Sequence, residues 1–110
     1  MKIAMLNCLK ANEVCAGAAC LKAFNSKTKH FEQYGEEPLE LVAMARCNGC
    51  EAGIDGGFEE KLERIVSIGT QVCHVGVCTV RRDLGTECPV ITKAAEYLEE
   101  HGVKVVRGTH

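Results

Sequence analysis

Cysteine is the residue in this chain with the most chemistry to offer, since it occurs eight times in 110 residues. That frequency is several times the ordinary one, so packing alone does not explain it. Cys47-Asn48-Gly49-Cys50 places two thiols two residues apart. Such a pair can bind a metal ion or alternate between dithiol and disulfide. The positions of the other cysteines must decide between these chemistries.

The elements that position the cysteines can be predicted from hydrophobic periodicity and from turn residues. Short apolar runs rich in β-branched residues predict strands at residues 2–9, 39–46, 70–78 and 103–106. Apolar residues at spacings of three and four predict helices at residues 17–34, 58–69 and 89–102. The first helix is expected to be interrupted near Asn25 and Ser26. Pro89 suits the first helical position of the third, which puts Cys88 at its cap.

The alternation of strands and helices indicates an α/β protein, because consecutive parallel strands need right-handed helical crossovers. We expect a three-layer sandwich with a four-stranded parallel sheet in the order 2-1-3-4. Residues 1–110 are expected to form a single domain. In such a sheet the first and third strands are central, and ligands bind beyond the carboxyl ends of the strands.

Most of the cysteines are predicted to gather at that carboxyl edge. Cys8, Cys47 and Cys78 close the first three strands, and His110 follows the fourth. The remaining members of the set lie in loops that leave the same edge. Neighbouring strands are about 4.8 Å apart, so thiols at adjacent strand ends are close to the separation that a shared metal requires. The predicted metal ligands are Cys8, Cys15, Cys47, Cys50, Cys78, Cys88 and His110.

Other cysteines and histidines fit a structural role better. Cys73 lies in the middle of a strand, five residues from Cys78, and is expected to pack in the core. Cys20 is expected on the first helix, either buried or beside the site. His74 lies four residues before Cys78, a separation that favours a core histidine over a metal ligand, although the ligand role stays open.

Composition excludes several classes of function. The formal charge is −2, and apart from Arg81 and Arg82 the basic residues are scattered, so we expect no nucleic-acid partner. No long apolar segment is present, so we expect neither a signal peptide nor a membrane span, and hence a cytoplasmic protein. In that reducing compartment cysteines serve metals or redox chemistry more often than structural disulfides. The expected partner is a metal ion, with room for a small-molecule ligand at the sheet edge.

Several short motifs occur together in the chain: Cys15-Ala16-Gly17, the central tetrapeptide Cys47–Cys50, Cys88-Pro89 and Gly108-Thr109-His110, alongside Cys8 and Cys78. With these motifs the chain resembles, over nearly its whole length, the CGGC domain family. Its members are small proteins rich in Cys and His and are described as metal-binding. The chain departs from the family in having Asn48 within the tetrapeptide and Val90, where many members have His, after Cys88-Pro89. The resemblance implies metal binding and supplies no substrate.

Three functions remain open at this stage. In the first, Cys47 and Cys50 form a knuckle that Cys8, Cys78 or a loop cysteine completes, and zinc or an iron-sulfur cluster would accept such ligands. The second is thiol-disulfide redox chemistry or thiol-based catalysis, although the helix predicted from Phe58 begins too far from Cys50 to activate it. The third is an interaction module with a purely structural metal. Whether the protein is an enzyme is left open.

Overall fold

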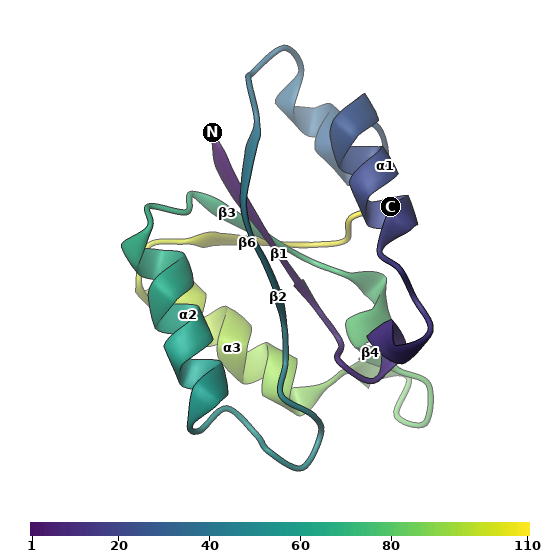
Figure 1. Cartoon of the computed structure of the whole chain (residues 1–110), viewed down its shortest axis with the longest axis vertical. Helices are drawn as coiled ribbons and strands as arrows, with labels where there is room; N and C mark the ends of the chain where they lie inside the picture. The colour runs from purple at the N-terminus through teal and green to yellow at the C-terminus, as the bar shows by residue number, and fades with distance from the viewer.

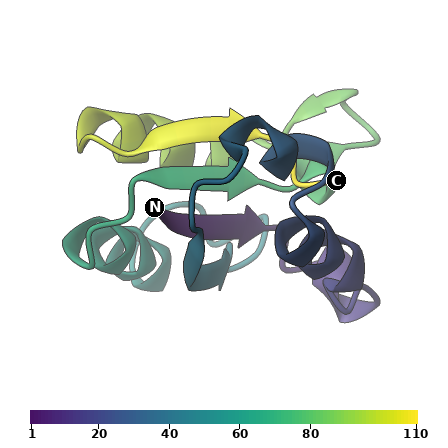
Figure 2. The same cartoon turned by 90° about the horizontal axis from the view of Figure 1, so that it is seen from above.

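Four parallel strands form the central sheet in the computed structural model, which describes all 110 residues. They are β1 (Lys2–Asn7), β2 (Glu40–Arg46), β3 (Val72–Val75) and β6 (Lys104–Arg107). Their order is β2-β1-β3-β6, so β1 and β3 are central (Figures 1 and 2). The predicted α/β class, the parallel sheet and the strand order are therefore confirmed.

Three α-helices connect the strands: α1 (Ala18–Ser26), α2 (Gly57–Ser67) and α3 (Pro89–Glu100). Because side chains alternate along a strand, neighbouring residues of β1 serve opposite faces of the sheet. Ala4 and Leu6 belong to a buried cluster with residues of α2 and α3. Ile3 and Met5 pack with α1 and with a 3₁₀ segment, η2 (Lys29–Tyr34). Every one of these four β1 side chains is fully buried, as a central parallel strand requires.

Several element boundaries differ from the prediction. The third strand ends at Val75 and gives way to a 3₁₀ turn, η3 (Val77–Thr79), so Cys78 follows the strand instead of closing it. The turn forms because both the backbone N–H and the hydroxyl of Thr79 donate to the carbonyl of Gly76, at 3.1 and 2.7 Å. The predicted interruption of the first helix is confirmed, since α1 ends at Ser26 and Lys27 takes a positive φ of 50°.

A short antiparallel hairpin was not predicted. Its strands, β4 (Val80–Arg81) and β5 (Thr86–Glu87), contain two residues each, which is too short to show an alternating pattern. The hairpin lies between η3 and α3 and ends immediately before Cys88. It therefore helps to place the start of α3 at the carboxyl edge of the sheet.

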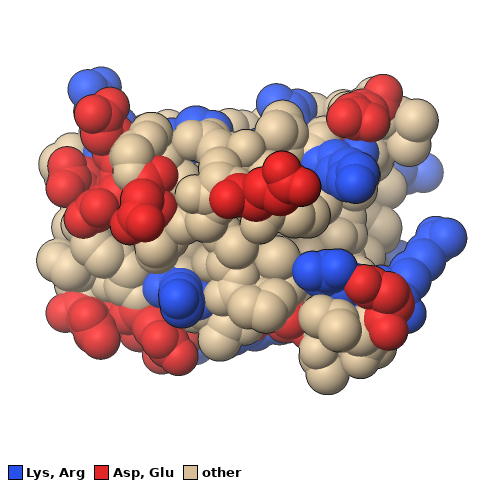
Figure 3. All heavy atoms as spheres, turned by 90° about the horizontal axis from the view of Figure 1, so that it is seen from below, with Lys and Arg blue, Asp and Glu red and all other residues tan.

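The lengths of the helices and the distribution of charged side chains bear on the predictions made from composition. None of the helices has the length and apolar character needed to cross a membrane. On the face drawn in Figure 3, acidic and basic side chains are interspersed, and no continuous basic patch crosses it.

Candidate functional site

The exit of the central strand β1 lies between two cysteines that follow its neighbours. Cys47 comes directly after β2, and Cys78 lies in the turn after β3. The backbone N–H of Cys8 donates to the sulfur of Cys78 at 3.3 Å. The next N–H, that of Leu9, donates to the sulfur of Cys47 at 3.4 Å. Two consecutive amides thus hold the two sulfurs, and a donated N–H favours the thiolate form of a cysteine.

On the Cys78 side of this exit the structure encloses a small cavity of about 40 Å³. Three thiols and an imidazole line it, together with two asparagine amides. Cys8 adjoins these residues through its amide contact with Cys78. We call Cys8, Cys15, Cys20, Cys78 and His110 the cavity group. The lining residues are Asn7, Asn12, Cys15, Gly17, Cys20, Gly76, Val77, Cys78 and His110.

The start of α1 brings Cys15 and Cys20 to this cavity. Gly17 caps the helix with a φ of 74°, in the left-handed region that glycine adopts readily, and its N–H donates to the sulfur of Cys15 at 3.4 Å. Cys20 lies in the first turn of the helix. Cys15 precedes the helix, so helical spacing does not hold the two thiols apart.

Cys78 carries the clearest electrostatic perturbation of the group. Burial raises the pKa of its thiol, the amide of Cys8 lowers it, and the charges of Cys8, Cys20 and Cys15 raise it further. The fold therefore keeps four thiols within electrostatic range of one another. Gly76 allows this crowding, because a Cβ at that position would overlap the side-chain oxygen of Asn7.

His110 reaches the cavity because the two residues before it are anchored. The N–H of Gly108 donates to the carbonyl of Val75 at 2.7 Å, and the carbonyl of Gly108 accepts from Nδ1 of His74 at 2.8 Å. The Thr109 hydroxyl lies 3.1 Å from the sulfur of Cys20 and is inaccessible to solvent. The chain is thus tied to β3 and α1 on its way to the cavity. His74 is fully buried, as predicted, and acts as an anchor at a distance from the thiols.

The other predicted ligands lie on the Cys47 side of the β1 exit. Cys47 and Cys88 are 5% and 9% exposed and belong to the core cluster with α2 and α3. Cys50 is exposed and lines an open hollow of about 430 Å³. The pKa of Arg81 is raised, chiefly by its hydrogen bond to Asp83 and also by the charges of Cys50 and Cys88. Arg81 is therefore within electrostatic range of Cys50 and Cys88. We call Cys47, Cys50 and Cys88 the tetrapeptide group.

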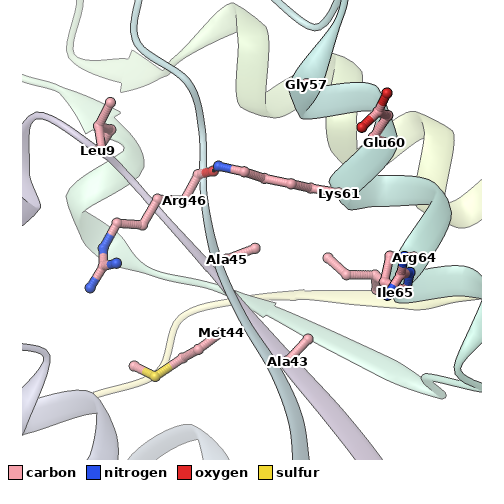
Figure 4. Close-up of a pocket in the computed structure, with 10 residues that line it drawn as sticks. All are labelled: Leu9, Ala43, Met44, Ala45, Arg46, Gly57, Glu60, Lys61, Arg64 and Ile65. Carbon is pink, nitrogen blue, oxygen red and sulfur yellow. Dashed lines mark hydrogen bonds between the residues drawn. The ribbon is translucent and has the colours of Figure 1, made fainter.

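Lys61 of α2 fixes the loop that carries the tetrapeptide. Its ammonium donates to the carbonyl of Arg46 at 2.8 Å, and Figure 4 shows the side chain crossing to the end of β2. It also donates to the side-chain oxygen of Asn48 at 2.6 Å. Gly49 has a φ of 107°, in the region that favours glycine. The larger hollow in Figure 4, of about 590 Å³ between β2 and α2, is lined by no cysteine.

The sequence predicted the position of Cys73 correctly but left the position of Cys20 open. Cys73 is fully buried in the middle of β3, where burial raises its pKa to about 12, so it packs in the core as predicted. Cys20 is also buried, yet it lines the cavity. The sequence signal for the position of Cys20 is Gly17, which caps the helix two residues after Cys15.

The donors fit a thiophilic metal in their chemistry, but the side chains do not form a coordination sphere as they stand. All eight cysteines are free thiols, and no three Cys, His, Asp or Glu side chains are placed to hold one ion. Cys15 and His110 are exposed, so both side chains have room to rotate. Binding would require that rotation toward the sulfurs of the buried Cys20 and the half-buried Cys78.

Comparisons with known proteins identify relatives of this chain. A sequence model of the CGGC domain matches residues 2–110. An uncharacterized protein of Methanocaldococcus jannaschii is 35% identical over 118 aligned residues, which span 100% of this chain and 87% of the relative. No solved structure matches the chain. From the match over nearly every residue, the chain belongs to the CGGC domain family.

Proposed function

We propose that the protein binds a single zinc ion through the cavity group. The observation that carries this proposal is that one small cavity is lined by Cys15, Cys20, Cys78 and His110, with Cys8 beside it. Thiolate and imidazole are the ligands that zinc takes in tetrahedral sites. Family membership adds support, because the resemblance of the sequence to CGGC proteins already implied metal binding.

The electrostatics of the cavity group also favour a bound cation. Burial and three neighbouring thiols make it unfavourable for Cys78 to ionise alone. A divalent cation would remove that penalty, since metal binding is coupled to loss of the thiol protons. The N–H groups that donate to Cys78 and Cys15 would stabilise the metal-bound sulfurs as they stabilise thiolates.

The size of the cavity favours one ion over an iron-sulfur cluster. Its volume of about 40 Å³ is close to the ~30 Å³ that one water molecule occupies in the liquid. A cluster with several irons and bridging sulfides needs more room than this cavity offers. Four ligands would close the zinc shell, so we propose a structural role for the ion.

The test is the metal content of protein purified without oxygen, with two matched pairs of variants. Cys20 and Cys88 are both buried, and Cys15 and Cys50 are both exposed. We expect stoichiometric zinc in the wild type, in Cys88→Ser and in Cys50→Ser, and loss of zinc in Cys20→Ser and Cys15→Ser. Cobalt substitution should give the intense absorption of tetrahedral thiolate ligation. Metal-free wild type that a chelator does not destabilise, or zinc lost only from the Cys88 and Cys50 variants, would refute the proposal.

A further inference from the structure

We propose that Cys50 and Cys47 act as a thiol pair that reduces small disulfides, with Cys50 as the attacking thiol and Cys47 as the resolving thiol. The pair does not depend on the zinc site, because it lies on the other side of the β1 exit. Leu9 contacts the sulfur of Cys47, whereas Cys8 contacts that of Cys78. Neither Cys47 nor Cys50 lines the enclosed cavity.

The two thiols differ in exposure in the way that such a reaction needs. Cys50 is exposed and opens into the hollow of about 430 Å³, where a small disulfide can reach it. Cys47 is 5% exposed, so an external disulfide cannot reach it, whereas Cys50 is only three positions along the chain. The arrangement thus assigns the first attack to Cys50 and the second to Cys47.

The charges around Cys50 fit a small disulfide that carries both amino and carboxylate groups. One basic residue, Lys10, and two acidic residues, Glu13 and Glu51, line the hollow. Arg81 lies within electrostatic range of Cys50. The helix dipole plays no part here, because α2 begins only at Gly57.

The loop is held in place before any reaction occurs. Lys61 binds both Asn48 and the end of β2, and a Cβ on Gly57 would lie 2.9 Å from the Asn48 amide nitrogen. This close packing ties the turn between the thiols to the first residue of α2. Asn48, at which this chain departs from the family's glycine, therefore restrains the tetrapeptide.

The reaction balances with a small disulfide as the oxidant. The Cys50 thiolate attacks one sulfur, the substrate S–S bond breaks, and one small thiolate leaves and takes a proton. Cys47 then loses its proton and attacks the sulfur of Cys50, which forms the Cys47–Cys50 disulfide and releases the second small thiol. The substrate gains two electrons and the pair loses two. A dithiol reductant returns the pair to the free thiols seen in this structure.

The experiment exposes the zinc-loaded protein to oxidised glutathione without oxygen, followed by alkylation and peptide mass spectrometry. The wild type should form the Cys47–Cys50 disulfide and carry no lasting adduct at Cys50. Cys47→Ser should retain one glutathione on Cys50, and Cys47→Ala repeats this with a different side chain in the buried position. Cys50→Ser should form neither product.

Cys15 is the other exposed thiol of the chain, and the proposed zinc site would hold it, so the rates at Cys50 and Cys15 are compared on protein from which a chelator has removed the zinc. We expect Cys50 in the wild type to react at least about tenfold faster than Cys15, because disulfide exchange depends on access to the attacking thiol and the hollow beside Cys50 admits a small disulfide. Equal rates at the two thiols, or a lasting adduct on Cys50 in the wild type, would overturn the proposal. Zinc content read in the same samples separates the two proposals. If the thiol pair does not react but the zinc is retained, only the proposal for the thiol pair fails. If oxidation of the pair releases the zinc, Cys47 and Cys50 are zinc ligands.

Discussion

Replacement of His74 by Phe tests the anchor that brings His110 to the cavity. The carbonyl of Gly108 can only accept, so Nδ1 of His74 carries the proton, and Nε2 accepts from the Tyr34 hydroxyl at 2.6 Å. Phe keeps the ring that packs 4.3 Å from Phe31, centroid to centroid, but leaves the buried Gly108 carbonyl without this donor. An unsatisfied buried group costs about 1–3 kcal/mol. We therefore expect the free energy of unfolding to fall by about 2 kcal/mol at pH 7.5.

The same substitution should change how stability depends on pH. Burial is the main cause that lowers the pKa of His74; the bond to Gly108 raises it, and the charges of His30 and Lys104 lower it. The unfolded chain takes up a proton near pH 6.5 that the folded chain rejects. The wild type therefore loses stability as the pH falls below 6.5, by at most about 1.4 kcal/mol per unit. Phe cannot titrate, so the deficit of the variant should be smaller at pH 5.5 than at pH 7.5.

Urea unfolding followed by circular dichroism at pH 7.5 and 5.5 measures both effects. His101→Gln is the control, because that histidine is exposed at the end of α3. If His74→Phe and the wild type lost equal stability between the two pH values, the assignment of a neutral, proton-rejecting His74 would be wrong.

Two further substitutions test single contacts. Gly108→Ala should cost more stability than Gly102→Ala. Both residues have positive φ, but only at Gly108 would the added Cβ overlap the ring of His30. Thermal unfolding measures the two losses, and equal losses would show that backbone strain alone matters. Burial raises the pKa of Glu87, but hydrogen bonds from Arg107 and Thr92 outweigh it and hold the pKa below 4.5, so Glu87→Gln should cost about 1 kcal/mol at pH 7. That stabilisation is present above pH 4.5 and is lost as the pH falls through the folded pKa. A loss in Glu87→Gln that stayed constant down to pH 3 would contradict this assignment.

Much of the fold follows from local patterns in the chain. The buried run of β1 and the amphipathic stripes of α2 and α3 each reflect the period of one element, and the alternation of elements limits the sheet to few orders. The cap position of Cys88 and the core position of Cys73 could be predicted for the same reason. The early end of β3 could not, because the Thr79 turn competes locally with strand pairing.

By itself the sequence determined that this is a parallel α/β protein whose cysteines follow its strands, because periodicity and turn residues report on each element separately. Only the tertiary structure decided which cysteines share a site. The contacts that divide them join residues 70 positions apart, for Cys8 and Cys78, and 38 apart, for Leu9 and Cys47. Two adjacent amides hold sulfurs on opposite sides of one strand end, and no local pattern encodes that direction. The central tetrapeptide therefore lies apart from the cavity that Cys20, through the start of α1, helps to line.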